Sequence, residues 1–271
     1  MRDAAEFLRR AGFGAAALDR LPADASHRHY ARLRGGPRPA LLMDAPPPED
    51  VRPFLAVARH IAGLGLSAPA ILAADEEQGF LLIEDFGDAT HAALLDAGAD
   101  PLPLYLDAAE ALAALHAAPP PGFLPPWDPA TMARATAATF LDWWWPAALG
   151  ATPDAEARAQ LDAAIRAMLA PFADAGGFVH RDYFPANLMR LDARTGPCRT
   201  GLLDFQDAAI GHPAYDLVSL VEDARRDVAP AVRTAAIGRY LDARGAIDRD
   251  AFAAAMAVCA AQRHLRVAAL W

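Results

Sequence analysis

Two polar segments, each directly after a short apolar run, constrain the fold of this chain more than any other feature. The first segment, residues 180–187, reads HRDYFPAN and follows GFV. The second, residues 204–207, reads DFQD and follows GLL. Short apolar runs next to glycines and polar residues are typical of strands. We therefore expect short strands at residues 178–179 and 201–205, with Asp204 at a strand end facing a cleft.

These segments carry the groups that phosphoryl transfer to a hydroxyl requires. One carboxylate must accept a hydrogen bond from the attacking hydroxyl, a second must hold magnesium against a triphosphate, and an amide oxygen must complete the metal's ligands. In protein kinases, an H-R-D-x-x-x-x-N loop and a following strand-end Asp supply this set. We therefore predict Asp182 as the catalytic base, with Asn187 and Asp204 as Mg²⁺ ligands. Either segment alone also fits an ordinary loop or strand, but their order and spacing favour function.

Composition narrows the class of protein. Hydrophobic residues make up 54% of the 271 residues, which disfavours disorder. The net charge of -9 disfavours nonspecific binding to nucleic acid. The two cysteines, Cys198 and Cys259, lie far apart and fit no metal-ligand pattern, so we expect both to be buried, reduced thiols in the cytoplasm. Neither a signal peptide nor a membrane span is predicted.

Hydrophobic patterning predicts a small sheet followed by a larger helical region. In the first part we expect a helix at residues 4–12, a second helix from Pro48 to Gly63, and strands at residues 33–34, 40–43, 71–72 and 80–83. Later helices are expected from residue 104 until Pro119, at residues 131–145 and 155–172, and over the rest of the chain after residue 205. That last pattern carries no C-cap signal, so either the chain is truncated or its tail ends as an open helix.

The overall expectation is an α+β, protein-kinase-like fold with two lobes. A natural boundary falls near residues 85–88, between the sheet region and the helical region. We therefore predict a nucleotide-binding lobe at residues 1–86 and a catalytic, substrate-binding helical lobe at residues 87–271.

Nearly the whole chain resembles the aminoglycoside phosphotransferase/choline kinase superfamily. The resemblance lies in LAALH at residues 112–116, the HRD loop, DFQD, and GHPAYDL at residues 211–217. It implies ATP and Mg²⁺ as cofactors. It also implies that Asp216 is structural, tying the catalytic loop in place, and does not bind metal.

Within this superfamily, four segments are similar to the bacterial cytosolic N-acetylmuramate/N-acetylglucosamine anomeric kinases. These segments are DASHRHY (residues 24–30), LMDAP (42–46), GFLLIEDFGD (79–88) and DFQDA (204–208). The resemblance implies transfer of the γ-phosphate of ATP to the anomeric hydroxyl of an amino sugar, to give an α-1-phosphate for recycling of cell-wall sugars.

The nucleotide site departs from the protein-kinase pattern in two ways. There is no G-x-G-x-x-G loop, and residues 23–26 stand in its place, where the Ser26 hydroxyl is a candidate phosphate donor. A plain turn is the alternative. All 25 basic residues are arginine, so no lysine can pair with the phosphates. Arg28 is our candidate for that role, Arg32 is a second, and magnesium alone is a third.

Adenine is expected to bind at the connection that follows the strand at residues 80–83. Backbone groups of Glu84, Asp85 and Phe86 are the predicted hydrogen-bond partners of the base. This prediction follows from position alone, because backbone contacts leave no signature in side chains.

The acceptor site is less readable. Tyr183 and Phe184 follow the predicted base, and Gln206 and Asp207 follow the metal ligand, so all four are candidate sugar contacts. Trp144 is a further candidate because aromatic faces suit sugar rings, although core packing explains the Trp run as well. We interpret three histidines, His116, His180 and His212, as structural.

Other interpretations remain open. The acceptor could be an aminoglycoside, choline or homoserine, and a tryptophan cage would suit choline. The missing lysine also leaves a non-catalytic nucleotide-binding module as an alternative, although such a protein has no need for the Asp182, Asn187 and Asp204 set. We expect a monomer that binds only small molecules.

Overall fold

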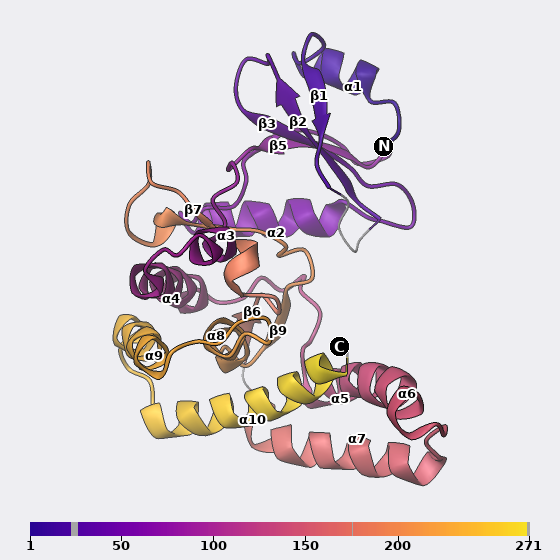
Figure 1. The fold of residues 1–271 in the computed structure, drawn as a ribbon, viewed down its shortest axis with the longest axis vertical. Helices are drawn as coiled ribbons and strands as arrows, with labels where there is room; N and C mark the ends of the chain where they lie inside the picture. Colours follow the sequence, from indigo (N-terminus) through magenta and orange to yellow (C-terminus); the bar gives the residue numbers. More distant parts are fainter. Residues whose placement is uncertain (23–26, 175, 270–271) are drawn as a thin grey trace.

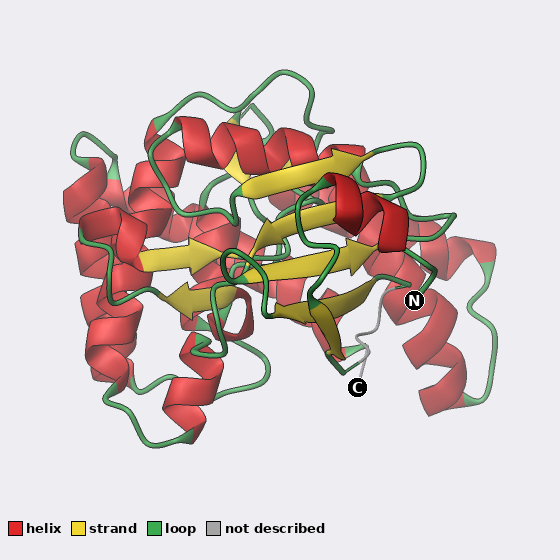
Figure 2. Ribbon diagram, turned by 90° about the horizontal axis from the view of Figure 1, so that it is seen from above, coloured by secondary structure: helices red, strands yellow, loops and turns green. Residues whose placement is uncertain are grey.

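The N-terminal part of the protein is built around an antiparallel five-stranded sheet. A computed structural model describes residues 1–22, 27–174 and 176–269, and the strand order is β1-β2-β3-β5-β4. Two helices accompany the sheet (Figures 1 and 2). The elements are β1 Ala17–Arg20, β2 His29–Arg34, β3 Ala40–Asp44, β4 Ile71–Asp75, β5 Phe80–Glu84, α1 Ala5–Arg10 and α2 Arg52–Gly63.

The central strands β3 and β5 are apolar on both faces, which explains why a helix packs on each. Leu42 and Leu82 lie in the cluster that contains residues of α1. Met43 and Leu81 lie in the cluster that contains residues of α2. Because successive side chains of a strand point to opposite faces, the two runs supply both clusters at once.

The rest of the chain is mainly helical and lies on the other side of α2 from the sheet (Figure 1). Its helices are α3 His91–Asp96, α4 Pro101–Ala117, α5 Pro129–Thr139, α6 Trp145–Leu149, α7 Ala155–Leu169, α8 Ala214–Val221, α9 Pro230–Arg244 and α10 Arg249–Ala268. Two antiparallel strand pairs lie among them: β6 Gly177–Val179 with β9 Ala209–Gly211, and β7 Leu188–Arg190 with β8 Thr200–Leu202. Shorter elements are the π-helical turn η1 Phe140–Trp144 and the 3-10 turns η2 Ala170–Phe172, η3 Pro185–Asn187 and η4 Gly196–Arg199.

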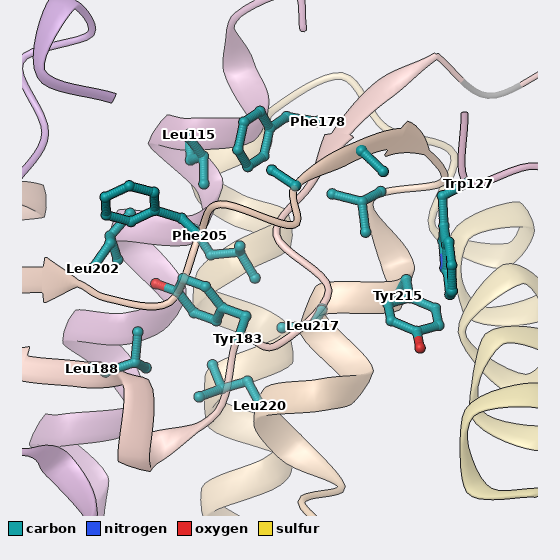
Figure 3. Packing of buried hydrophobic residues seen from close by; sticks show 14 of the residues in the cluster. Leu115, Trp127, Phe178, Tyr183, Leu188, Leu202, Phe205, Tyr215, Leu217 and Leu220 are labelled. Carbon is teal, nitrogen blue, oxygen red and sulfur yellow. The ribbon is translucent and has the colours of Figure 1, made fainter. Parts of the chain in front are cut away.

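A continuous hydrophobic core holds the catalytic segments in place. It joins Ile83 of β5 to Leu112 of α4 and Leu217 of α8. Figure 3 shows its centre, where Tyr183 and Phe205 enter from the two polar segments and pack beside Leu217. Both aromatic side chains have 0% exposure. Each polar segment is therefore anchored by an aromatic residue directly after its key aspartate.

The α+β, protein-kinase-like fold class expected from the sequence is confirmed. The details differ. Strands β1, β7 and β9 were not predicted, α2 begins at Arg52 and not near Pro48, and the turn η1 interrupts the helix expected at residues 131–145. The lobe boundary after residue 86 stays a prediction, since the core crosses it. Over the described residues, every helix is too short or too polar to cross a membrane.

Candidate active site

The loop that carries Asp182 is held from behind by a buried carboxylate. Asp216 of α8 has 0% exposure. Its Oδ2 accepts the backbone N–H of His180 at 2.6 Å, and its Oδ1 accepts that of Arg181 at 2.9 Å. His116 Nε2 lies 3.2 Å from the same Oδ2. The structural role expected for Asp216 is confirmed, because these bonds fix the two residues that precede Asp182.

Arg181 links this loop to the second polar segment. Its backbone is in the left-handed region with φ 76°, which is rare for a residue other than glycine. Its Nη1 donates to the carbonyl oxygen of Asp207 at 3.1 Å, and its guanidinium lies 4.4 Å from the centre of the Trp127 ring. The turn that presents Asp182 is thus fixed by backbone geometry and by a side-chain contact across the site.

Asn187 lies between the Asp182 loop and Asp204. Asn187 Nδ2 donates to the Asp182 carbonyl oxygen at 3.0 Å and lies 3.3 Å from Asp204 Oδ2. Both contacts use the amide nitrogen, so they leave the amide oxygen for a metal ion. Asp204 lies two residues beyond the end of β8, in a left-handed conformation with φ 57°.

A cavity of about 380 Å³ adjoins Asn187 and Asp204. Apolar side chains from the sheet, α2 and the helical part form much of its wall, while the polar segments supply one end. Its lining includes Tyr30, Leu41, Phe54, Ile83, Glu84, Phe86, Asn187, Met189, Leu203, Asp204 and Gln206. An apolar pocket that ends in hydrogen-bonding groups suits a flat ring that carries a charged tail.

Of the three residues predicted to bond to adenine, Glu84 and Phe86 line this cavity. The Glu84 carboxylate accepts a hydrogen bond from Arg194 Nη2 at 2.6 Å, and the Glu84 backbone N–H donates to the carbonyl oxygen of Ala70. The Phe86 ring lies against Gly201, where an added Cβ would come within 2.8 Å of it. Asp85 differs, because its side chain binds Arg32 at 2.5 Å and is absent from the cavity lining.

The two candidate arginines have different roles. Arg28 precedes β2 and does not lie on it, and its Nε contacts Glu49 at 2.9 Å. Burial acts to lower the pKa of Arg28, but Tyr30, Glu49 and Asp204 together raise it. Arg28 is therefore within electrostatic reach of Asp204.

Arg32 instead joins β2 to the segment after β5. It binds both Asp85, at 2.5 Å, and Asp88, at 2.8 Å. We interpret it as a structural clamp. The Ser26 prediction lies outside the described residues.

The predicted acceptor residues do not all reach the site. Tyr183 has 0% exposure and its hydroxyl donates to the Ala108 carbonyl oxygen, so the structure assigns it to the core (Figure 3). Trp144 stacks on Phe140, with 4.8 Å between ring centres, and lines none of the described cavities. Phe184 is largely buried, with 7% of its surface exposed, and its ring lies under the guanidinium of Arg225. Asp207 is exposed beside the loop.

Gln206 has a role that the sequence did not indicate. Its Nε2 donates to Asp204 Oδ1 at 2.7 Å, so it orients the carboxylate from the side opposite Asn187. The sequence suggested a sugar contact because Gln206 follows the metal ligand. No pattern in the sequence reveals that a side chain bonds back over two residues in a left-handed turn.

The three histidines are buried or half-buried in packed surroundings. His116 pairs with Tyr240 and Asp216, and His212 Nδ1 accepts the N–H of Ala214. His180 is fully buried and meets the Tyr183 ring edge to face, with 5.5 Å between centres. These contacts agree with a structural role, in which His180 braces the catalytic loop.

Comparisons with known proteins agree with this geometry. A protein from Caulobacter vibrioides called N-acetylmuramate/N-acetylglucosamine kinase is 38% identical over 299 aligned positions, covering 97% of this chain and 82% of the relative. A protein of the same name from Pseudomonas aeruginosa is 42% identical, but the match covers 74% of this chain and 58% of that protein.

Solved structures show the same fold at low sequence identity. A choline kinase from Cryptosporidium parvum has a TM-score of 0.66 at 12% identity, covering 98% of this chain and 87% of that one. An aminoglycoside-3'-phosphotransferase of type VIII has a TM-score of 0.57 at 22% identity, covering 96% and 99%. The model of the phosphotransferase enzyme family (APH) matches residues 17–254. This chain therefore belongs to the phosphotransferase enzyme family.

Proposed function

We propose that the protein is an ATP-dependent kinase that phosphorylates the anomeric hydroxyl of N-acetylmuramate and N-acetylglucosamine. One observation supports the reaction class: Asn187 donates to the backbone carbonyl oxygen of Asp182 and lies 3.3 Å from the Asp204 carboxylate, so the proposed metal ligands lie next to the loop that carries the proposed base. The name shared by the relatives supports the choice of acceptor. Use in recycling of cell-wall sugars, in the cytoplasm and as a monomer, is part of the same proposal.

The cavity of about 380 Å³ is the proposed ATP site. Adenine would lie between the apolar walls and bond to backbone groups of residues 84–86, while the phosphates would extend toward Asp204. Arg28 is the proposed cation for the phosphates, because Asp204 is among the groups that raise its pKa. In this proposal residues 1–86 form the nucleotide-binding lobe and share the cavity lining equally with residues 87–271, which supply catalysis.

Asn187 and Asp204 have the oxygen donors that Mg²⁺ prefers. The described residues contain no cluster of three or more His, Cys, Asp or Glu side chains that would hold a metal. A site with one carboxylate and one amide fits an ion that takes its remaining ligands from phosphates and water. When bound, the ion would neutralise charge on the transferred phosphoryl group.

Asp182 is the proposed base. Its carboxylate would accept a hydrogen bond from the anomeric hydroxyl and aim that oxygen at the γ-phosphate. Most of the rate gain would come from positioning and charge stabilisation. Asp216 and Arg181 fix the backbone of the loop that carries Asp182.

The test is a substrate panel with the product read by ³¹P NMR. With ATP and Mg²⁺, we expect N-acetylmuramate and N-acetylglucosamine to give an anomeric phosphate, and kanamycin, choline and homoserine to give none. Turnover of one of those three alone would contradict the acceptor assignment. ATP binding without turnover of any acceptor would instead favour a non-catalytic nucleotide-binding module.

The variant Asp182→Asn tests the proposed base. We expect kcat to fall by roughly three orders of magnitude or more, because the hydroxyl loses its acceptor, while ATP affinity stays within about threefold. Calorimetric titration with a non-hydrolysable ATP analogue checks the affinity. Normal turnover by this variant would refute the assignment of the base.

A further inference from the structure

Arg225 lies in the connection between α8 and α9, and its ion pairing differs from that of Arg28, Arg32 and Arg190. Arg28, Arg32 and Arg190 each bind a carboxylate within 3.0 Å. The nearest carboxylate contact of Arg225 is with Asp223 at 3.5 Å, and its side chain is 45% exposed. Within the described residues no side chain forms a shorter ion pair with it. Its guanidinium is thus accessible to a ligand.

Two contacts fix the position of this cation. The Arg225 guanidinium carbon lies 4.1 Å from the centre of the Phe184 ring. The backbone N–H of Arg225 donates to Asp223 Oδ1 at 3.1 Å. Stacking on Phe184 orients the planar guanidinium, and the backbone bond holds the main chain at Arg225, before any ligand binds, which reduces the cost of binding an anion.

Phe184 connects Arg225 to the catalytic loop. It follows Asp182 by two residues, and its N–H donates to the Asp182 carbonyl oxygen at 3.1 Å, so the chain turns tightly there. Two residues span at most about 7 Å. The stacked guanidinium therefore lies beside the turn that carries the proposed base.

Two further arginines, Arg263 and Arg266, lie on α10 close to the residues that surround the site. Arg263 of α10 is 1% exposed, and its Nε and Nη1 have no hydrogen-bond partner in the described part of the chain. Burial lowers the pKa of Arg263, whereas Tyr215, Asp182 and Asp223 act to raise it. Arg266 Nη2 donates to the Tyr215 hydroxyl at 3.2 Å.

We propose that Arg225 recognises the carboxylate of an acidic acceptor sugar while the anomeric hydroxyl of that sugar lies at Asp182. This inference rests on the proposed function. N-acetylmuramate differs from N-acetylglucosamine by a lactyl ether on carbon 3 of the ring, and that group carries the only charge. Arg225 binds it through a charge-assisted, two-pronged contact, and with the neutral sugar the same guanidinium stays stacked on Phe184.

The test compares the two sugars on Arg225→Gln. We expect KM for N-acetylmuramate to rise roughly 10- to 100-fold, and KM for N-acetylglucosamine to change less than about twofold, with kcat kept for both. Arg225→Lys should recover only part of the loss, because an ammonium is a point charge without the fork.

Arg226→Gln is the matched control. It removes the neighbouring arginine, which binds Asp96 at 2.6 Å, and it should leave both KM values unchanged. Equal effects of Arg225→Gln on the two sugars, or an effect on neither, would overturn the inference. Loss of kcat on both would show that Arg225 acts on the transferred phosphoryl group.

A measurement on the unaltered protein covers the case in which the variants do not fold. The methyl ester of N-acetylmuramate lacks the negative charge and should show the same rise in KM on the unaltered enzyme. An ester that binds as well as the acid would contradict the carboxylate contact. If the unaltered protein phosphorylates neither sugar, the proposed function is wrong. If it phosphorylates the acid and the ester with equal KM, only the carboxylate contact is wrong.

Discussion

At the scale of single residues, one buried carboxylate organises the catalytic loop. Asp216 accepts two backbone N–H groups and faces His116, and it is shielded from water. Among the described residues, these groups fix the position of its carboxyl oxygens. The charge that matters most for the position of Asp182 belongs to a residue that touches no substrate.

Asp216→Asn should destabilise the protein strongly. The amide that replaces one oxygen would point N–H groups at another N–H donor, and we expect the free energy of unfolding to fall by roughly 3–5 kcal/mol. Urea denaturation followed by circular dichroism measures this. Asp207→Asn, at an exposed position, is the control and should change stability by less than about 0.5 kcal/mol. Equal stability of the two variants would contradict the role given to Asp216.

At the scale of elements, the sequence predicts best where an element is long or fully apolar. Residues of β3 and β5 form runs that are buried on both faces, and α4 carries Leu112 and Leu115 at helical spacing with 0% exposure. By contrast, β1 is exposed along its whole length and β9 has three residues, so neither leaves a periodic pattern. These strands form because their partners in the fold supply hydrogen bonds.

The contact between α4 and α9 gives a prediction at this scale. Tyr240 of α9 has 0% exposure, and its hydroxyl lies 2.9 Å from His116 Nδ1 of α4. Tyr240→Phe should lower the free energy of unfolding by about 1–2 kcal/mol, because the buried ring nitrogen loses its partner. Activity at 25 °C should be unaffected.

Tyr105→Phe is the matched control for this pair. Tyr105 of α4 is 3% exposed, and its hydroxyl has no hydrogen-bond partner among the described residues. Removing it should leave stability unchanged or slightly higher. Comparable losses in both variants, measured by urea denaturation, would show that the bond to His116 is not what stabilises the α4–α9 contact.

At the scale of the whole molecule, the sequence predicts which residues form the candidate site but not the contacts that support them. Asp182, Asn187 and Asp204 were found because their chemistry imposes a fixed order and spacing. Gln206 and Arg225 act through contacts that depend on backbone turns and on packing between distant segments. Such contacts leave no spacing in the sequence, and this is also why Tyr183 looked like a substrate residue although it lies in the core.

The stability of the whole protein should depend on pH through its buried histidines. Burial, and to a lesser extent Arg190, lowers the pKa of His91 from 6.5 to about 4. The folded state therefore keeps this ring neutral, whereas the unfolded chain protonates it below pH 6.5. Above pH 6.5 the buried neutral ring does not reduce the free energy of unfolding. As the pH falls from 6.5 toward 4, the free energy of unfolding decreases by about 1.4 kcal/mol for each pH unit.

His91→Gln tests this dependence by urea unfolding at pH 7 and pH 5. The stability of the variant should fall about 2 kcal/mol less over this interval than that of the unaltered protein. His27→Gln, at an exposed position, should follow the unaltered protein. Parallel pH profiles for His91→Gln and the unaltered protein would contradict the prediction.

The left-handed backbone of Asp204 limits which amino acids evolution can place there. Any residue other than Asp, Asn or Gly at this position would lower the stability of the fold by about 1–2 kcal/mol, with or without catalysis. A descendant that had lost its enzymatic activity would therefore tend to keep one of these three at position 204. Asp182 has no such backbone requirement, since only Arg181 and Asp204 among the described non-glycine residues have positive φ. When sequences descended from this one are compared, the residue at position 182 therefore indicates retained catalytic activity better than the residue at position 204.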